Sequence, residues 1–98
     1  MHATIRAIKV KPGQAAQVGA LIEAEYVPLL QQVDGFVAYT LVDLGSDEVR
    51  SLGIFSSEAG AQGANDLARD WTARRLADLV DSPLDAREGA VLVHARPS

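Results

Sequence analysis

The chain has 98 residues, 48% of them hydrophobic and 22% charged, a composition that excludes a disordered polypeptide and fits one domain over residues 1–98. The formal net charge of −4, with no basic run longer than two residues, argues against a nucleic-acid partner. Zero cysteines exclude disulfides, thiolate catalysis and thiolate metal sites. Because the sequence has neither a signal-peptide layout nor an apolar run of membrane-spanning length, we expect a cytoplasmic protein with no membrane partner.

The first third of the sequence predicts a strand followed by an interrupted helix. Residues 3–10 alternate apolar and polar side chains as a strand does, and Lys-Pro-Gly at 11–13 is typical of a turn. Residues 14–33 have apolar side chains at steps of three and four, which indicates one buried stripe of a helix. Because Pro28 removes a hydrogen bond and crowds the carbonyl four residues earlier, we expect a kink near Ala24.

A β-hairpin is predicted in the middle of the chain. Residues 36–43 and 49–55 have the composition of strands, and Leu-Gly-Ser-Asp at 44–47 supplies the turn residues between them. We therefore expect two antiparallel strands joined by a loop of several residues. Ser56 or Ser57 then provides an N-cap for the next helix.

The last third predicts a second helix and a fourth strand. The helix that Ser56 or Ser57 caps opens with the Ala/Gly-rich stretch 59–64, which is a weak helix former, and residues 66–81, ended by Ser82 and Pro83, predict a stronger helix. The sequence leaves open whether the two pieces join. Residues 90–95, Ala-Val-Leu-Val-His-Ala, are typical of a strand. The predicted order of elements is β-α-β-β-α-β.

This order predicts an α+β, ferredoxin-like fold. Right-handed crossovers give a four-stranded antiparallel sheet in the spatial order fourth, first, third, second, with the helices on one face. The predicted strands carry apolar side chains on both faces, whereas one layer of helices can cover only one. We therefore expect a second copy of the same sheet to cover the other face, which makes the chain a homodimer.

Three short motifs follow one another along the chain: Val-Lys-Pro-Gly at 10–13, Asp-Gly-Phe-Val-Ala-Tyr at 34–39, and Leu-Gly-Ile-Phe at 52–55 before a helix start. In order and spacing, over nearly the whole chain, they resemble the antibiotic-biosynthesis-monooxygenase-like (ABM) members of the dimeric α/β-barrel superfamily. The resemblance implies a homodimer whose two sheets pack face to face, with a cavity between sheet and helices in each protomer. Enzymes that the chain resembles oxidise polyketide-like aromatics without metal or flavin, or bind and degrade haem; others have no known activity.

The resemblance also implies a site that combines an asparagine, a tryptophan and a tyrosine, histidine or arginine. Asn65 and Trp71 are the available pair, but six residues on a regular helix leave them about 120° out of phase, so they converge only if the helix breaks. Trp71 is either a cavity wall on which a planar ligand stacks or an anchor of the core. Arg75 either stacks on Trp71 and presents a cation to the substrate or covers apolar surface.

Arg6 and Tyr39 are candidate catalytic residues on predicted strands. Arg6, on the strand expected at the centre of the sheet, either holds a substrate carboxylate or enolate or pairs with Glu88, Asp43 or an acid of a partner subunit. Tyr39 either hydrogen-bonds the substrate or abstracts its proton, or else it is structural. The sequence does not decide between these readings, because it does not fix which face of each strand meets the cavity.

His2 and His94 are predicted to lie near each other at the ends of neighbouring antiparallel strands. His94 is a third candidate catalytic residue, as a base. A two-histidine metal site lacks a third ligand at metal-site spacing, and neither histidine lies on the helix that offers an axial ligand in similar haem-degrading proteins. We therefore expect no metal and no cofactor.

Three functions fit these residues. In the first, a small dimeric barrel binds a hydrophobic or aromatic small molecule and acts as a cofactor-independent monooxygenase, in which His94, Tyr39 or Arg6 stabilises a substrate anion beside Trp71. In the second, the same barrel is a non-catalytic ligand-binding or stress-type protein. In the third, it is an isomerase or cyclase that only transfers protons. The sequence alone leaves open whether the protein is an enzyme.

Overall fold

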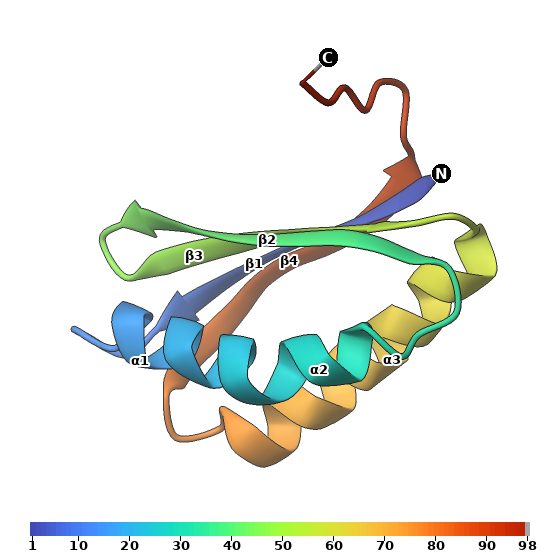
Figure 1. Ribbon diagram of the computed structural model, residues 1–98. Helices are drawn as coiled ribbons and strands as arrows, with labels where there is room; N and C mark the ends of the chain where they lie inside the picture. The colour runs from blue at the N-terminus through green and yellow to red at the C-terminus, as the bar shows by residue number, and fades with distance from the viewer. Residues whose placement is uncertain (98) are drawn as a thin grey trace.

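The strands and helices follow the predicted order β-α-β-β-α-β (Figure 1). The computed structural model describes residues 1–97. Its elements are β1 (His2–Val10), α1 (Ala15–Leu21), the π-helical turn η1 (Ile22–Tyr26), α2 (Val27–Leu30), β2 (Phe36–Gly45), β3 (Glu48–Phe55), α3 (Glu58–Arg75) and β4 (Val80–Ala90).

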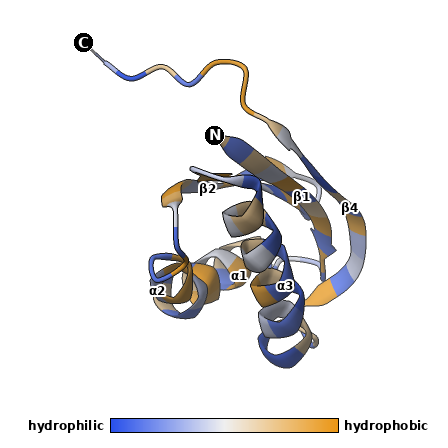
Figure 2. Cartoon of the chain, turned by 90° about the vertical axis from the view of Figure 1, so that its right-hand side faces the viewer, coloured by the Kyte–Doolittle hydropathy of each residue, from blue (hydrophilic) through white to orange (hydrophobic). Residues whose placement is uncertain are grey.

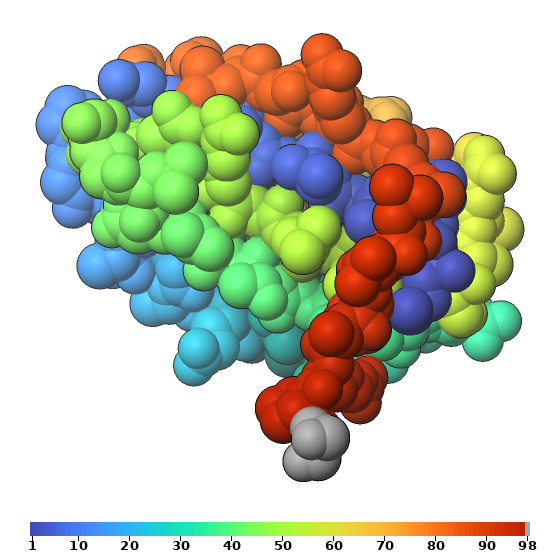
Figure 3. All heavy atoms as spheres, turned by 90° about the horizontal axis from the view of Figure 1, so that it is seen from above, coloured from blue at the N-terminus to red at the C-terminus, as the bar shows by residue number. Residues whose placement is uncertain are grey.

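The sheet confirms the ferredoxin-like α+β prediction. Its strands are antiparallel in the order β2-β3-β1-β4, which is the predicted order read from the opposite edge. Figure 1 shows α1, α2 and α3 together on one face of the sheet. Of the residues described, only the tail after β4 lies over the other face, where it crosses one end of the sheet (Figure 3). This second face is called the bare face below.

The β2–β3 hairpin is tighter than the loop predicted from the sequence. β2 continues to Gly45, and the backbone turns through three successive residues with positive φ: Gly45 at 84°, Ser46 at 54° and Asp47 at 62°. Asp47 also holds the preceding β1–α1 turn, because its carbonyl accepts from the Val10 N–H and its carboxylate accepts from the Gly13 N–H at 3.1 Å. The hairpin end is thereby fixed to the end of the central strand.

The first helical region is interrupted where the sequence predicts a kink. Ala24 lies in the middle of η1, and Pro28 lies at the start of α2. Pro28 has no N–H to donate to the carbonyl of Ala24, and a π-helical turn accommodates the missing i→i−4 bond. Ile22 and Tyr26, at the two ends of η1, are both buried and both face the interior cavity described below.

The second helix ends earlier than predicted. It spans Glu58–Arg75 without a break, so the Ala/Gly-rich opening joins the stronger piece, and the predicted end at Asp81 was wrong. Ser57 is the N-cap, and its Oγ accepts from the Gly60 N–H at 3.1 Å, one of the two caps expected from the sequence. Capping and the burial of three alanines outweigh the weak propensity of the glycines. None of the helices in residues 1–97 combines the length and apolarity needed to cross a membrane.

The fourth strand also lies earlier than predicted. β4 is the largely polar segment Val80–Ala90, whereas the β-rich residues 90–95 were expected to form it. Pro83 does not end a helix but lies within β4, beside a register shift, which is tolerated because β4 is an edge strand. His2 pairs with Ala90, and the N–H of Val91 donates to the carbonyl of Met1 as the last bond. β4 ends at Ala90, and no strand of residues 1–97 pairs with the apolar residues 92–95 that follow.

The hydrophobic core lies between the sheet and the helices. The first helical region buries one residue in every four: Val18, Ile22, Tyr26 and Leu30. α3 buries mainly small side chains, namely Ala61, Ala64 and Ala68, together with Trp71. Phe55, Val49 and Val10 cover them from the sheet. Because the alanines of α3 fill little volume, space is left beside Trp71, between the helices and the sheet.

Two glycines of α3 have opposite surroundings and give a paired prediction. A Cβ at Gly60 would lie 2.8 Å from the carbonyl oxygen of Asp34, whereas a Cβ at Gly63 would meet nothing within 4 Å. We expect Gly60→Ala to lower the free energy of unfolding by about 1–3 kcal/mol through overpacking. Gly63→Ala should raise it by about 0.5–1 kcal/mol through helix propensity. Urea denaturation of both variants checks this, and effects of the same sign would contradict the packing seen at Gly60.

Candidate functional site

A cavity of about 280 Å³ lies between the sheet and the helices. Alternate residues of β1, β2 and β3 face it, so Arg6 lies on its wall while Ile5 points to the bare face. Its surface is mostly apolar. The lining comprises Thr4, Arg6 and Ile8 of β1, Tyr39 and Leu41 of β2, Val49, Ser51, Gly53 and Phe55 of β3, Ile22, Tyr26 and Leu30 of the first helical region, Ala64, Ala68, Arg69, Trp71, Thr72, Ala73 and Leu76 on or beside α3, and Val80 and Pro83 of β4.

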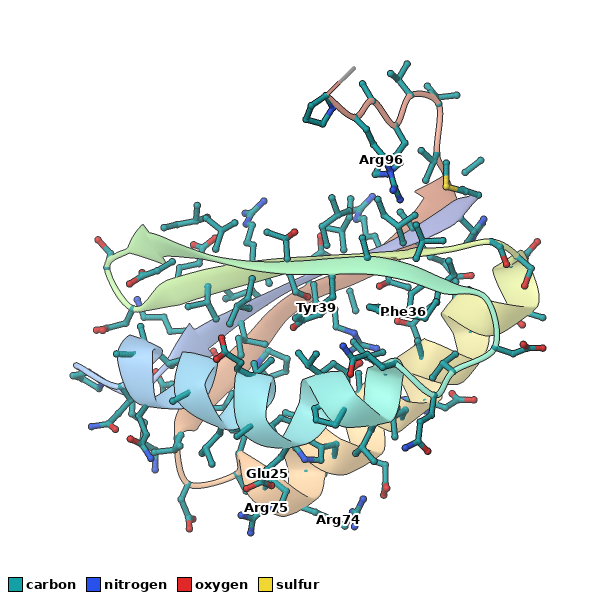
Figure 4. All side chains as sticks on the ribbon, viewed as in Figure 1. Glu25, Phe36, Tyr39, Arg74, Arg75 and Arg96 are labelled. Atoms are coloured by element: carbon teal, nitrogen blue, oxygen red, sulfur yellow. The ribbon has the colours of Figure 1, made fainter. Side chains whose placement is uncertain are left out.

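Three aromatic rings form one wall of the cavity. The Tyr26 ring centre lies 5.3 Å from that of Trp71 and 5.7 Å from that of Tyr39, the latter pair in an edge-to-face arrangement. In Figure 4, Tyr39 points from the sheet toward the helices. Trp71 is only 3% exposed, so it belongs to the core and lines the cavity at the same time. The sequence left open whether Trp71 is a core anchor or a cavity wall, and its position in the structure is compatible with both. The stacking of a ligand on it stays a prediction.

Both tyrosines of this wall are hydrogen-bond donors rather than bases at neutral pH. Burial raises the pKa of Tyr26, and the nearby Tyr39 raises it further, against an opposing effect of the Arg6 charge. Burial also raises the pKa of Tyr39, opposed by hydrogen bonding with Ser51 and by Arg6. A phenol whose pKa lies above its usual value of 10 is almost entirely protonated at pH 7. Tyr39 is therefore poorly suited to the proton abstraction considered from the sequence.

Arg6 is held on the cavity wall by a chain of polar side chains. Its Nη2 donates to the backbone oxygen of Asn65 at 3.0 Å and to Asn65 Oδ1 at 2.8 Å. The Asn65 Nδ2 donates to Glu88 Oε2 at 2.7 Å, and the other Glu88 oxygen lies 3.9 Å from His2 Nε2. The sequence offered Glu88 as a direct partner of Arg6. The structure corrects this, because the neutral amide of Asn65 lies between the two charges.

Asn65 and Trp71 do not converge on the cavity, because α3 does not break between them. The prediction that they face different directions is confirmed, because Asn65 reaches the Arg6 guanidinium while Trp71 packs on Tyr26. Asn65 does not itself line the cavity, yet its neighbour Ala64 does. Its contribution to the site is therefore made through Arg6.

Arg75 lies away from the cavity. Its Nε and Nη2 donate to the two carboxylate oxygens of Glu25 at 2.7 and 2.9 Å, and Figure 4 shows this pair on the outer side of the helices. These hydrogen bonds are the main reason why the pKa of Glu25 is lowered. Arg75 thus joins α3 to η1 on the surface, and the predicted role in substrate binding has no support from its position.

His94 lies in the tail beyond β4, not in a strand beside His2 as predicted. It is absent from the cavity lining among the described residues. Its Nε2 is nonetheless buried and has no hydrogen-bond partner within residues 1–97. The neighbouring tail residues Leu92 and Val93 are 95% and 84% exposed, and Figure 2 shows an apolar stretch directly after β4. A role for His94 in the cavity is therefore not supported by its position in one chain.

A candidate cation site lies at the outer end of the polar chain. Donor atoms of His2, Glu58 and Glu88 all lie within 4.8 Å of one another, and one imidazole with two carboxylates suits a divalent cation. The sequence spacing did not indicate a third possible ligand. In the fold, Glu88 of β4, which pairs with β1, and Glu58, the first residue of α3, both lie near His2. This group is separated from the cavity by Asn65.

Tyr26 is the main site residue that the sequence did not indicate. It was assigned only to the apolar stripe of the first helix, and η1 directs it at Trp71 and Tyr39. Pro28, two residues later, was the available signal, since proline-induced π-helical turns often occur at functional sites. The sequence contains no comparable signal for Ser51, which needs the strand register to be known.

The sheet, its one helical layer and the enclosed aromatic cavity define a ferredoxin-like α+β protein with a pocket of small-molecule size. The family model described as antibiotic biosynthesis monooxygenase matches residues 1–67, more than half of the chain. The chain belongs to this family. No curated protein matches it significantly.

Solved structures resemble the whole chain. NE2512, a protein of unknown function from Nitrosomonas europaea, is 25% identical, with a TM-score of 0.79 over 99% of this chain and 94% of that one. Rv0793 from Mycobacterium tuberculosis is 19% identical, with a TM-score of 0.72 over 97% and 98%. A mutant of MhuD, with two manganese protoporphyrin IX molecules bound per active site, is 18% identical, with a TM-score of 0.74 over 99% and 100%. The last two support the fold alone.

Proposed function

We propose that the protein binds a hydrophobic, aromatic small molecule in the cavity and oxygenates it without a bound cofactor. The observation that carries this proposal is a mostly apolar cavity lined by three neighbouring aromatic rings and by two arginines, Arg6 and Arg69. Such a pocket receives a planar ligand and orients it through a few polar groups. Membership of the antibiotic biosynthesis monooxygenase family supports the oxygenation step.

In the proposed reaction, a CH₂ group that lies between two aromatic rings, and is made acidic through them by a carbonyl, becomes a second carbonyl. One O₂ is consumed, one oxygen atom enters the product, and the other leaves as water with the two hydrogens of the CH₂ group. The substrate loses one CH₂ proton to water, and the resulting enolate supplies the electrons. Arg6 stabilises the enolate oxygen, and the protonated Tyr26 and Tyr39 donate hydrogen bonds.

The same cavity also favours a second candidate, a binding protein without catalysis. Among the described residues that line the cavity, none has a carboxylate or an imidazole, so a general base is not at hand. An isomerase or cyclase needs such a base more than an oxygenase does, because proton transfer is its whole reaction. The binding protein is therefore the stronger alternative.

Oxygen uptake separates these candidates. Anthrone and ring-carboxylated anthrones are mixed with the protein in an oxygen electrode, and the products are identified by mass spectrometry. We expect uptake above the rate of autoxidation and one oxygen atom gained per quinone, with the exposed Arg74→Gln variant as active as the wild type. Tight binding without uptake would leave the binding protein. Proton exchange under nitrogen would identify an isomerase, and absence of binding would refute the site.

We further propose that the protein is a homodimer joined through the bare face. Ile5, Val42 and Leu52 are 40–48% exposed on this face, where they line a shallow, mostly apolar groove together with Thr40, Ser51 and Arg50. Figure 3 looks onto this face and shows that the tail crosses only one end of it. A large exposed apolar patch marks an interaction surface, and sheet-on-sheet packing is its simplest cover. The exposed Leu92 and Val93 would add to the same interface.

A further inference from the structure

Within residues 1–97, no acidic side chain pairs with the positive charge of Arg6. No carboxylate oxygen lies within 4.0 Å of its guanidinium among residues 1–97. Both hydrogen bonds to Asn65 use Nη2, and the N–H groups on Nε and Nη1 have no partner in this part of the chain. Burial is the main cause of a lowered pKa at Arg6. A partly buried cation normally has an anionic partner, because desolvation otherwise destabilises it.

The surroundings of Arg6 add no negative charge from the cavity side. Tyr26 and Tyr39 stay protonated at neutral pH because burial raises the pKa of each phenol. Arg69, which also lines the cavity, is positive, and its partner Asp66 lies 3.5 Å away on the exposed surface. The apolar cavity is therefore electropositive at the end that holds Arg6.

Asn65 orients Arg6 without neutralising it. Because the Asn65 Nδ2 donates to Glu88, its Oδ1 must face Arg6, and the acceptor fixes one edge of the guanidinium. The free N–H groups on Nε and Nη1 are left on the remaining edges. The negative charge of Glu88 stays on the far side of the amide, in an exposed position. The chain thus presents a positioned donor group to the cavity.

We infer that the ligand of this cavity is an aromatic carboxylate, with its rings against Trp71 and Tyr26 and its carboxylate hydrogen-bonded to Arg6. The inference rests on the proposed binding function and names its ligand class. A carboxylate is ionised at neutral pH even after a moderate penalty for desolvation. A free phenol, with a usual pKa of about 10, is not ionised at that pH. Charge-assisted hydrogen bonds from arginine then make the anion the preferred ligand.

The test compares 2-naphthoate with 2-naphthamide, which have the same ring system and differ in charge. Both are titrated calorimetrically into the full chain, with a chelator present so that no cation occupies the group around Glu88. A hydrogen bond to a charged group predicts that the wild type binds the carboxylate about 30-fold more tightly than the amide. Arg6→Gln should abolish this ratio and leave naphthamide binding within about twofold, whereas Arg74→Gln should change neither.

A second variant keeps the test valid if Arg6→Gln does not fold. Combining Asn65→Asp with Glu88→Gln exchanges the carboxylate and the amide, so the total charge is unchanged while a carboxylate is placed beside Arg6. We expect this variant to fold, to bind naphthamide and to lose the preference for naphthoate. If the preference survives in either variant, or if the wild type binds both compounds equally, the inference is wrong while the binding function stands. If neither compound binds, the proposed function itself fails.

Discussion

Leu52→Arg is expected to convert the protein from a dimer to a monomer. Leu52 lies at the centre of the bare face, where it pairs with Ile5 on β1 and with Thr40 on β2. In a dimer joined through this face, each protomer would bury one new guanidinium. The acids Glu48 and Asp85 are already paired with Arg50 and Arg87 of the same face. They are therefore not free to pair with the new arginines.

The expected size of this effect follows from desolvation. Burying an unpaired charge costs several kcal/mol even after relaxation, so the dissociation constant of the dimer should rise at least about 100-fold. Sedimentation equilibrium at micromolar concentration measures this directly. The matched control is Leu29→Arg on α2, because Leu29 is 38% exposed and Leu52 is 40% exposed, yet Leu29 lies on the helical side. We expect the control to stay dimeric.

Three outcomes would contradict a dimer joined through the bare face, each in a different way. A wild-type chain that sediments as a monomer would mean that the apolar residues of the bare face have another cover or none. A Leu52→Arg variant that dimerises as well as the wild type would place the interface elsewhere. Loss of dimerisation in both variants would indicate a general effect of added charge, which the bare-face model does not predict.

The order and topology of the fold could be predicted from the sequence because they depend on repeated local signals. Alternation marks β1, turn residues mark the β2–β3 hairpin, and the interval of four residues marks the first helical region. The end of α3 and the position of β4 could not be predicted in this way. β4 is polar and contains Pro83, and it becomes a strand only because β1 offers it an edge to pair with.

The same distinction separates the site residues. Arg6 could be predicted to need a hydrogen-bonding or charged partner, because a charged side chain on a central strand needs one on either face of the sheet. That its partner is the amide of Asn65 depends on the distance between α3 and β1, which no local pattern encodes. His94 was misplaced because the apolar residues around it resemble a strand, whereas β4 has already ended at Ala90 and no strand of residues 1–97 pairs with residues 92–95.

Trp71→Ala is expected to lower the free energy of unfolding by about 3–5 kcal/mol. The indole is 3% exposed and packs with its ring centre 5.3 Å from that of Tyr26, among the buried alanines of α3. This is a large part of the stability of a small domain, so the variant approaches unfolding at room temperature. Urea denaturation followed by circular dichroism measures the loss. A change below about 1 kcal/mol would mean that Trp71 is not the core anchor that its burial indicates.

Trp71→Phe tests the contribution of Trp71 to ligand binding separately from its contribution to stability. Phenylalanine keeps an apolar ring, so the fold should survive, but it offers less stacking surface to a bound aromatic molecule. We expect the affinity for 2-naphthamide to fall about three- to tenfold. Val18→Ala is the control: Val18 is fully buried in the core and does not line the cavity, so its loss should cost about 2 kcal/mol of stability without changing the affinity. Equal affinities in the wild type and Trp71→Phe would limit Trp71 to the core, because a side chain that forms the wall of an occupied pocket must contribute to binding as well as to packing.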